Sequence, residues 1–198
     1  FNAPGMKKTA QQIDGTGAMA LHRFAAIMDS LLTPRNQKWH ALEADDAYVM
    51  KDRDTRLWFE QVTKILFKYR YAPHANFASQ NQNVYQSLGA FGTGPMFIDQ
   101  FDGPNSGKGI RYKSIPLGEL FLRENHQGLV DGFCRWMRLT AEQALQKFGA
   151  DNFPLTLKPA LEQKSQNLFN FIHRCVPRTD YDPMRLDVRG KPFASFYI

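Results

Sequence analysis

The sequence predicts an α+β fold in which N-terminal helices pack on an antiparallel β-meander. Up to about residue 90, apolar residues recur at steps of three and four, a spacing typical of amphipathic helices. Glycines at positions 89, 92 and 94 interrupt this pattern, and short strand-like runs separated by turn residues follow. Apolar residues make up 43% of the 198 residues and charged residues 22%, which allows a packed core and excludes a strongly disordered composition. We therefore expect residues 1–90 to be mainly helical and 91–198 mainly stranded, with helices on one side of an antiparallel sheet.

The first helix is predicted to follow an irregular lead-in over residues 1–13. Asp14 or Thr16 can cap it, and it runs to about Leu32. Thr33-Pro34 ends it, because the residue before proline resists the helical conformation. Its apolar stripe consists of Ala20, Phe24, Ile27, Met28 and Leu31.

Two more helices are predicted before residue 90. One runs from about Asp54 to Tyr69, with Asp52 or Asp54 as its cap, and the other spans Asn76–Leu88. Between the first two helices, Gln37–Leu42 is a possible short strand anchored by Trp39, and Glu43–Arg53 is predicted to loop over the surface. Lys64, Lys68 and Arg70 lie toward the C-terminal end of the second helix, where cations suit the helix dipole. The apolar stripes are Trp58, Val62, Ile65, Leu66 and Tyr69 on the second helix, and Phe77, Val84, Tyr85 and Leu88 on the third.

Four strands should form the meander: Pro95–Phe101, Gly109–Pro116, Gly118–Asn125 and Leu129–Leu139. A glycine-rich loop joins the first pair, and a tight turn around His126–Gly128 joins the second. We expect Gly92 and Gly94 to let the third helix pack close to the strand that follows. Along the fourth strand, alternation places one set of side chains on each face. One set is Phe133, Arg135 and Met137, and the other is Cys134, Trp136 and Arg138.

The remaining chain is predicted to add helices and a strand pair. Thr140 and Gln143 form a capping box for a helix that Gly149 ends, with Ala144, Leu145 and Phe148 on its buried side. A short helix is possible from about Thr156 to Gln163. Asn167–Val176 and Pro192–Ile198 are predicted to pair as strands around the charged loop Pro177–Lys191. Because the last strand-like run continues to Ile198, we expect residues 1–198 to be a single fragment of a longer protein.

Composition gives only weak indications of a partner. The formal net charge of +6 favours contact with nucleic acid or acidic surfaces, but the positive residues are scattered, with short clusters at Lys64–Arg70 and Lys108–Lys113. Cys134 and Cys175 are expected to be buried free thiols. No apolar run approaches the ~20 residues that a membrane span needs. No signal peptide is visible in the sequence.

Candidate reactive sites are weak. The loop Asp102–Gly109 resembles a phosphate cradle, but Gly107-Lys108 is followed by glycine and a strand rather than by Ser or Thr and a helix. His173 and Cys175 lie on one face of a predicted strand and could bind a metal ion together. Cys134 would be only a third ligand, whereas a structural zinc site needs four ligands. The acidic pairs Asp45/Asp46 and Asp180/Asp182 are interpreted as turn formers. We therefore assign no catalytic, cofactor-binding or metal-binding residue, expect no cofactor, and leave the residues that contact nucleic acid unknown.

Several segments together resemble the head–tail connector, or portal, proteins of short-tailed bacteriophages and prophages. They occur in the family's order along nearly the whole chain, and each is a packing pattern rather than a reactive motif. The N-terminal segments are Gly15-Thr-Gly-Ala-Met-Ala, Leu32-Thr-Pro with Trp39, and Trp58 to Phe77 leading into Val84-Tyr-Gln-Ser-Leu-Gly-Ala-Phe-Gly-Thr-Gly-Pro-Met. The later segments are Pro116-Leu-Gly-Glu-Leu-Phe, Asn125-His-Gln-Gly-Leu-Val-Asp131, Arg135-Trp-Met-Arg-Leu-Thr-Ala-Glu-Gln143, Phe148-Gly149, Ile172-His-Arg-Cys-Val-Pro-Arg178 and Pro192-Phe-Ala-Ser-Phe-Tyr-Ile198.

The resemblance implies a structural, non-enzymatic protein of the virion. Such portals are typically dodecameric rings at one capsid vertex, assembled in the cytoplasm of the bacterial host, through which DNA is packaged and later ejected. Their partners are capsid, scaffolding, terminase and tail adaptor proteins, and double-stranded DNA bound without sequence preference. This chain would form the outward wing of the subunit, before the stem helices and the clip.

A free-standing basic nucleic-acid-binding domain is the alternative. It predicts tight binding by this chain alone and Lys or Arg side chains clustered on one face of the sheet. An enzyme would need a pocket with converging polar groups, and the sequence offers no candidates for one.

Overall fold

The computed structural model describes residues 14–103 and 107–198, and the chain divides into two compact units. Unit 1 is Phe1–Leu117 and unit 2 is Gly118–Ile198. The predicted lead-in over residues 1–13 and the loop tip at 104–106 lie outside the described residues. That residues 1–198 form a single α+β fragment of a longer protein stays a prediction.

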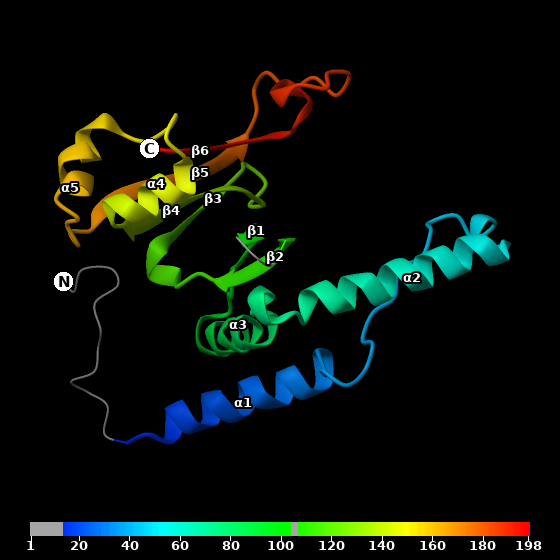
Figure 1. Cartoon of the computed structure of the whole chain (residues 1–198). Helices are drawn as coiled ribbons and strands as arrows, with labels where there is room; N and C mark the ends of the chain where they lie inside the picture. The colour runs from blue at the N-terminus through cyan, green and yellow to red at the C-terminus, as the bar shows by residue number, and fades with distance from the viewer. Residues whose placement is uncertain (1–13, 104–106) are drawn as a thin grey trace. The chain divides into compact units, whose positions relative to one another are not determined.

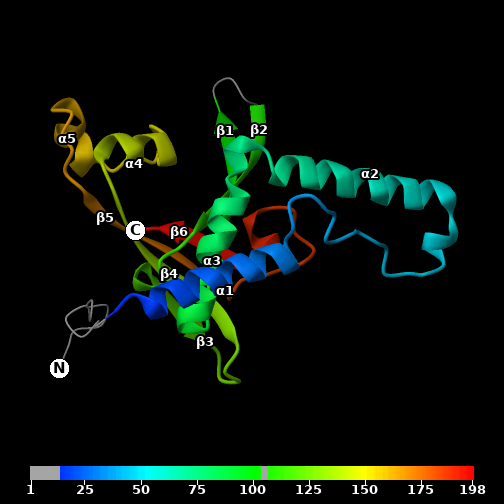
Figure 2. The same cartoon turned by 90° about the horizontal axis from the view of Figure 1, so that it is seen from below.

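The described residues of unit 1 form three α-helices and a β-hairpin (Figures 1 and 2). The helices are α1 (Thr16–Leu32), α2 (Arg53–Arg70) and α3 (Phe77–Phe91), and short 3-10 turns precede α2 and α3 at Val49–Lys51 and Pro73–Ala75. All three helices were predicted within a few residues. Figure 2 shows α1 and α3 crossing each other, and in both views α2 extends away from them. Amphipathic spacing therefore located the helices of this unit correctly.

The helix ends follow local chemistry. Asp52 caps α2, because its carboxylate accepts a hydrogen bond of 2.8 Å from the backbone N–H of Thr55. Gly92, at φ 74°, ends α3 in the left-handed region that glycine adopts without strain. Gly89, however, does not end the helix as predicted. It lies inside α3, where an added Cβ would come within 2.7 Å of the Phe24 side chain on α1, so its role is close packing between helices.

The interior of unit 1 contains an aromatic cluster. Phe77 and Tyr112 are buried beside Ala75, and the Phe77 and Tyr112 rings meet edge to face with centroids 4.9 Å apart. The predicted strand at Gln37–Leu42 is wrong, since these residues are irregular. Trp39 is nevertheless the packing anchor that was predicted: its ring stacks on Phe77, and its indole N–H donates to the Tyr71 hydroxyl at 3.1 Å.

The strands predicted after residue 90 all form, but they do not form one continuous meander. A two-stranded sheet pairs β1 (Met96–Gly103) with β2 (Gly107–Ser114). A separate four-stranded antiparallel sheet has the order β3-β4-β5-β6. Its strands are β3 (Leu120–Glu124), β4 (Val130–Leu139), β5 (Phe169–Pro177) and β6 (Phe193–Tyr197). The chain changes sheet at Pro116, which has no N–H to donate, and at the 3-10 turn Leu117–Glu119.

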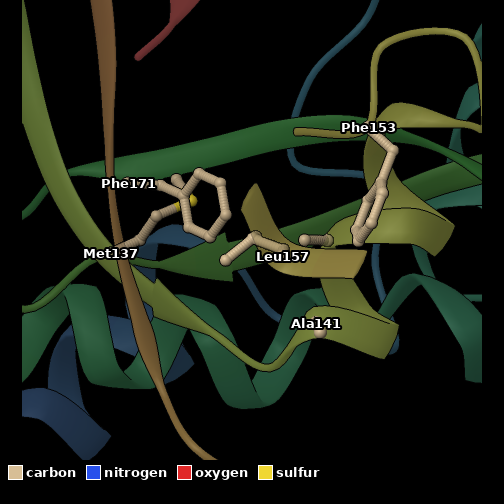
Figure 3. Packing of buried hydrophobic residues seen from close by; sticks show 6 residues of the cluster. Met137, Ala141, Phe153, Leu157 and Phe171 are labelled. Atoms are coloured by element: carbon tan, nitrogen blue, oxygen red, sulfur yellow. The ribbon is translucent and has the colours of Figure 1, made fainter. Parts of the chain in front are cut away.

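Unit 2 covers one face of its sheet with helices. The capping box of Thr140 and Gln143 starts α4 (Ala141–Phe148), as predicted, and Gly149 at φ 74° follows its last residue. The possible helix after Thr156 is the short α5 (Lys158–Glu162), preceded by a 3-10 turn at Leu155–Leu157. These elements bury Met137 of β4 and Phe171 of β5 (Figure 3). The rest of the buried cluster is Ala141, Ala144, Phe153 and Leu157.

Candidate assembly surfaces

The glycine-rich hairpin loop does not open a helix. Gly107 and Lys108 already belong to β2, whose register with β1 pairs Gly103 with Gly107. A phosphate cradle of the P-loop type needs backbone N–H groups at a helix N-terminus, and a strand does not provide them. The described part of the loop therefore agrees with the interpretation as a hairpin connection.

The possible metal ligands do not converge. His173 lies opposite Arg135 across the β4–β5 ladder, whereas Cys134 lies opposite Arg174, so Cys134 is on the other face of the sheet from His173. The Nε2 of His173 lies 2.8 Å from the Ser195 hydroxyl, and its ring stacks on Tyr197 with centroids 4.4 Å apart. Cys134 and Cys175 are free and half-buried. Within residues 14–103 and 107–198, no group of three or more His, Cys, Asp or Glu side chains could hold a metal ion.

The two acidic pairs belong to turns. Asp46 accepts a hydrogen bond of 2.8 Å from the backbone N–H of Tyr48, and Asp182 accepts one of 3.0 Å from that of Met184. Asp180 forms exposed ion pairs with Arg178 and Arg189. Asp46 and Asp182 thus stabilise local backbone, which is the turn-forming role that the sequence indicated for each pair.

Among the hollows in the described part of the chain, two hold charged side chains that neighbouring groups already contact. One, of about 480 Å³, lies between α4 and β6, and its charged lining residue Lys147 sits over the Tyr197 ring. The other, also about 480 Å³, lies at the C-terminal end of α1. It holds the Asp29–Arg35 ion pair at 4.0 Å, and Asp29 also accepts a hydrogen bond from the Thr33 hydroxyl. The charged side chains of both hollows are therefore already engaged within the chain: Lys147 by an aromatic ring, and Asp29 and Arg35 by each other.

The most distinctive surface is the face of the four-stranded sheet opposite α4 and α5. The register places Trp136 directly opposite Ile172, and Ile172 in turn exchanges both backbone hydrogen bonds with Ile198. Phe121, Cys134, Arg174 and Phe196 form the next row across the four strands. Large apolar side chains stay exposed here, 63% for Phe121 and 40% for Trp136. We call this surface the arginine–aromatic face; it consists of Phe121, Trp136, Arg138, Ile172, Arg174, Phe196 and Ile198.

The two arginines of this face lie over aromatic rings. The Arg138 guanidinium carbon is 5.3 Å from the centroid of the Trp136 ring, and that of Arg174 is 5.8 Å from the Phe196 ring. Among the described residues, neither arginine has a carboxylate within ion-pair distance. Their N–H groups therefore remain available to an anionic group outside the sheet, next to exposed apolar surface.

A second apolar surface runs along α2. Trp58 is 58% exposed and Ile65 44%, and Leu57 and Tyr69 are also exposed. The side of α2 that packs within the chain is centred instead on Thr63, whose hydroxyl oxygen accepts a hydrogen bond of 3.1 Å from the backbone N–H of Leu42. The predicted stripe of α2 is thus largely exposed, as are Ile27 and Leu31 of the α1 stripe. Exposed apolar patches of this kind mark interaction sites.

Sequence reasoning identified only part of these surfaces. Alternation along β4 already grouped Cys134, Trp136 and Arg138 on one face, and the structure confirms that grouping. It did not indicate that Arg174 and Phe196 join them, because that depends on the register of β5 and β6. No signal in the sequence distinguished which apolar stripe would stay exposed.

No helix within the described residues is long and apolar enough to cross a membrane.

Exposed apolar and arginine-bearing faces define a protein suited to work through contacts with other macromolecules. The family described as "Bacteriophage head to tail connecting protein" matches residues 2–198. The chain belongs to this family.

Relatives with a stated role agree with the family. The chain is 27% identical over 193 residues to the portal protein of Salmonella phage epsilon15, a match that covers 97% of this chain and 34% of the relative. It is 26% identical over 201 residues to the probable portal protein of Bordetella phage BPP-1, covering 98% of this chain and 34% of the relative. The chain therefore spans about a third of the length of the curated relatives that it matches.

Proposed function

We propose that this chain is one fragment of a longer portal subunit with a structural role and no reaction of its own. The full-length protein forms a ring, dodecameric in the expected case, at one vertex of a phage capsid. DNA is packaged through the ring and later ejected through it. The observation that carries this proposal is the family match over residues 2–198, at about a third of the length of two portal relatives.

The surfaces support a subunit that is completed by neighbours. Some of the exposed apolar side chains gather on the sheet face opposite α4 and on one side of α2. Interfaces between subunits of permanent assemblies resemble a protein core cut in half. The proposed partners are further copies of the subunit, capsid and scaffolding proteins, the terminase and a tail adaptor, in the virion and during its assembly in the bacterial cytoplasm.

Contact with double-stranded DNA is proposed to be weak and independent of sequence. With a net charge of +6 and scattered basic residues, phosphate contacts can position DNA without reading its bases. We expect the affinity of the full-length ring for DNA to fall steeply with salt and to be equal for unrelated duplexes of one length. Fluorescence anisotropy over a salt series measures both properties. Sequence-selective binding that persists at high salt would contradict the proposal.

A free-standing nucleic-acid-binding domain remains the second candidate, because the arginine–aromatic face fits one of its expectations. Arginines next to exposed aromatic rings on an antiparallel sheet can stack on the bases of a single strand. This candidate expects tight binding of single-stranded oligonucleotides by the 198-residue chain alone, with loss of binding in Trp136→Ala. The portal proposal expects no tight complex. Titration of the chain with labelled oligonucleotides separates the two.

A further inference from the structure

The arginine–aromatic face has a complementary surface elsewhere on the same chain. We propose that it binds the acidic loop of a second copy of this protein, where the acidic loop is defined as residues 42–49. The proposal rests on the proposed ring function and deepens it, since it assigns the two surfaces through which neighbouring subunits meet.

The acidic loop combines negative charge with exposed apolar side chains. Glu43, Asp45 and Asp46 are exposed, and among the described residues none of the three forms an ion pair. Tyr48 is 77% exposed and Val49 43%. The arginine–aromatic face has the matching chemistry, two arginines without carboxylate partners beside exposed Trp136, Ile172 and Phe196.

The loop is held in shape before any partner arrives. The backbone N–H of Leu42 donates to the hydroxyl of buried Thr63 at 3.1 Å, and the N–H of Ala44 contacts the Met50 sulfur at 3.4 Å. Asp46 closes the turn through the Tyr48 N–H at 2.8 Å. A pre-organised loop loses little conformational entropy on binding, so more of its interaction free energy appears as affinity.

The register of the sheet places the two arginines on either side of an exposed apolar pair. Arg138 lies opposite Asn170, which is four residues before Arg174 on the same strand, so the two arginines are separated by about 13 Å along the strands. The Trp136–Ile172 pair lies between them. A loop that places Tyr48 and Val49 on this pair brings the carboxylates that precede them in the loop toward the neighbouring guanidinium groups.

The two surfaces differ, which determines the kind of assembly. An interface between unlike patches of identical chains is heterologous, and repeated heterologous contacts close into a ring when the rotation between neighbours permits. The electrostatic part of the contact would fix the register between neighbours and exclude wrong pairings, because like charges brought together are unfavourable.

Reversing the charges tests the contact between copies. In the full-length protein, the face variant Arg138→Glu/Arg174→Glu and the loop variant Glu43→Lys/Asp45→Lys, which leaves the turn-closing Asp46 unchanged, should each lose ring assembly, with the association constant at least about tenfold lower. Mixing the two variants restores both complementary contacts, because a Glu-bearing face meets a Lys-bearing loop and the unchanged loop meets the unchanged face. We expect rings in the mixture by mass photometry, and mainly smaller species in each variant alone.

Control variants separate this effect from a general change of charge. Lys158→Glu/Lys191→Glu makes the same change of charge as the face variant, and Asp151→Lys/Glu162→Lys matches the loop variant; all four control positions are exposed. Both controls should assemble like the unchanged protein, and circular dichroism should show that every variant is folded. Face or loop variants that assemble normally, or folded variants whose mixture fails to assemble, would overturn the proposal.

The same variants distinguish failure of this inference from failure of the proposed function. Rings that form regardless of the charge reversals would leave the portal role intact and refute the contact. If the unchanged full-length protein forms no ring, the portal role itself fails. The contact is then decided by sedimentation of the 198-residue variants, where complex formation only in the mixture supports it and its absence refutes it. Loss of oligonucleotide binding by the face variant, without any effect on association, would assign the face to nucleic acid instead.

Discussion

At the scale of single residues, Thr33 links the end of α1 to α3. Its side-chain oxygen lies 3.2 Å from the Tyr85 hydroxyl and accepts a hydrogen bond of 3.0 Å from the Asn81 amide, while its own hydroxyl can donate to Asp29. Thr33, Asn81 and Tyr85 are all buried. In the sequence Thr33 appeared only as the residue that ends a helix before proline. Its network depends on residues about fifty positions away, which local patterns do not indicate.

Replacing the Thr33 hydroxyl tests this network. Thr33→Val keeps the side-chain shape but leaves buried polar groups of Asn81 and Tyr85 without a partner, so the free energy of unfolding should fall by about 1–3 kcal/mol. Urea denaturation measures the change. Tyr85→Phe combined with Thr33→Val should cost less than the sum of the two single changes, because the residues are in contact. Additive losses would contradict a shared network.

Gly89 tests the close packing of α1 on α3. An alanine Cβ there would lie 2.7 Å from the Phe24 ring and 2.9 Å from Leu21, whereas at Gly17 in α1 it would meet nothing within 4 Å. Gly17→Ala should therefore stabilise the protein by up to about 1 kcal/mol through helix propensity. Gly89→Ala should lose that gain or become destabilising, by about 1–3 kcal/mol at most. Thermal unfolding of both variants measures the contrast, and an equal gain at both positions would contradict the packing.

At the scale of elements, the sequence located helices and strands well and their partners less well. The capping box of Thr140 and Gln143 and the strand alternation around Arg135 depend on neighbours in the sequence, and both were predicted correctly. The division into two sheets was missed, because strand pairing is a non-local property. The exposure of Trp58 and Ile65 was missed for a similar reason, since only the tertiary structure shows which side of α2 the preceding loop covers.

The start of α2 gives a prediction with a pH dependence. Hydrogen bonds from the Thr55 backbone N–H, and then from its hydroxyl, lower the pKa of Asp52 below its ordinary value. A carboxyl whose pKa is lower in the folded state stabilises that state fully above its unfolded pKa, and the contribution disappears as pH falls through the folded pKa. Asp52→Ala should therefore lower the Tm at neutral pH, and the loss should become smaller as the carboxyl group is protonated in acid.

Calorimetry of the unchanged protein and Asp52→Ala over a pH series measures this difference. Asp151→Ala is the matched control, since Asp151 is an exposed carboxylate outside α2 and outside the acidic loop, and its Tm difference should stay small throughout. A Tm difference for Asp52→Ala that stays constant or grows in acid would mean that the cap does not act through the ionised carboxylate.

At the scale of the whole molecule, the proposed function rests on the surfaces and the family. The sequence alone suggested the portal family through packing motifs, and the match over residues 2–198 confirms the family. The sequence did not identify the arginine–aromatic face, because that face assembles residues that are distant in the chain. It did not identify the complement in the acidic loop, because that surface depends on which side chains are exposed. The sequence did contain two candidate sites, the glycine-rich loop and the possible metal-ligand pair His173 and Cys175. Both have structural explanations.

The central claim is that this chain builds the wall of a ring through which DNA passes. Electron microscopy of the full-length protein tests it most directly. We predict a closed ring with a central opening, in which the arginine–aromatic face of each subunit is covered by its neighbour. A monomeric particle, or an assembly without a central opening, would contradict the account.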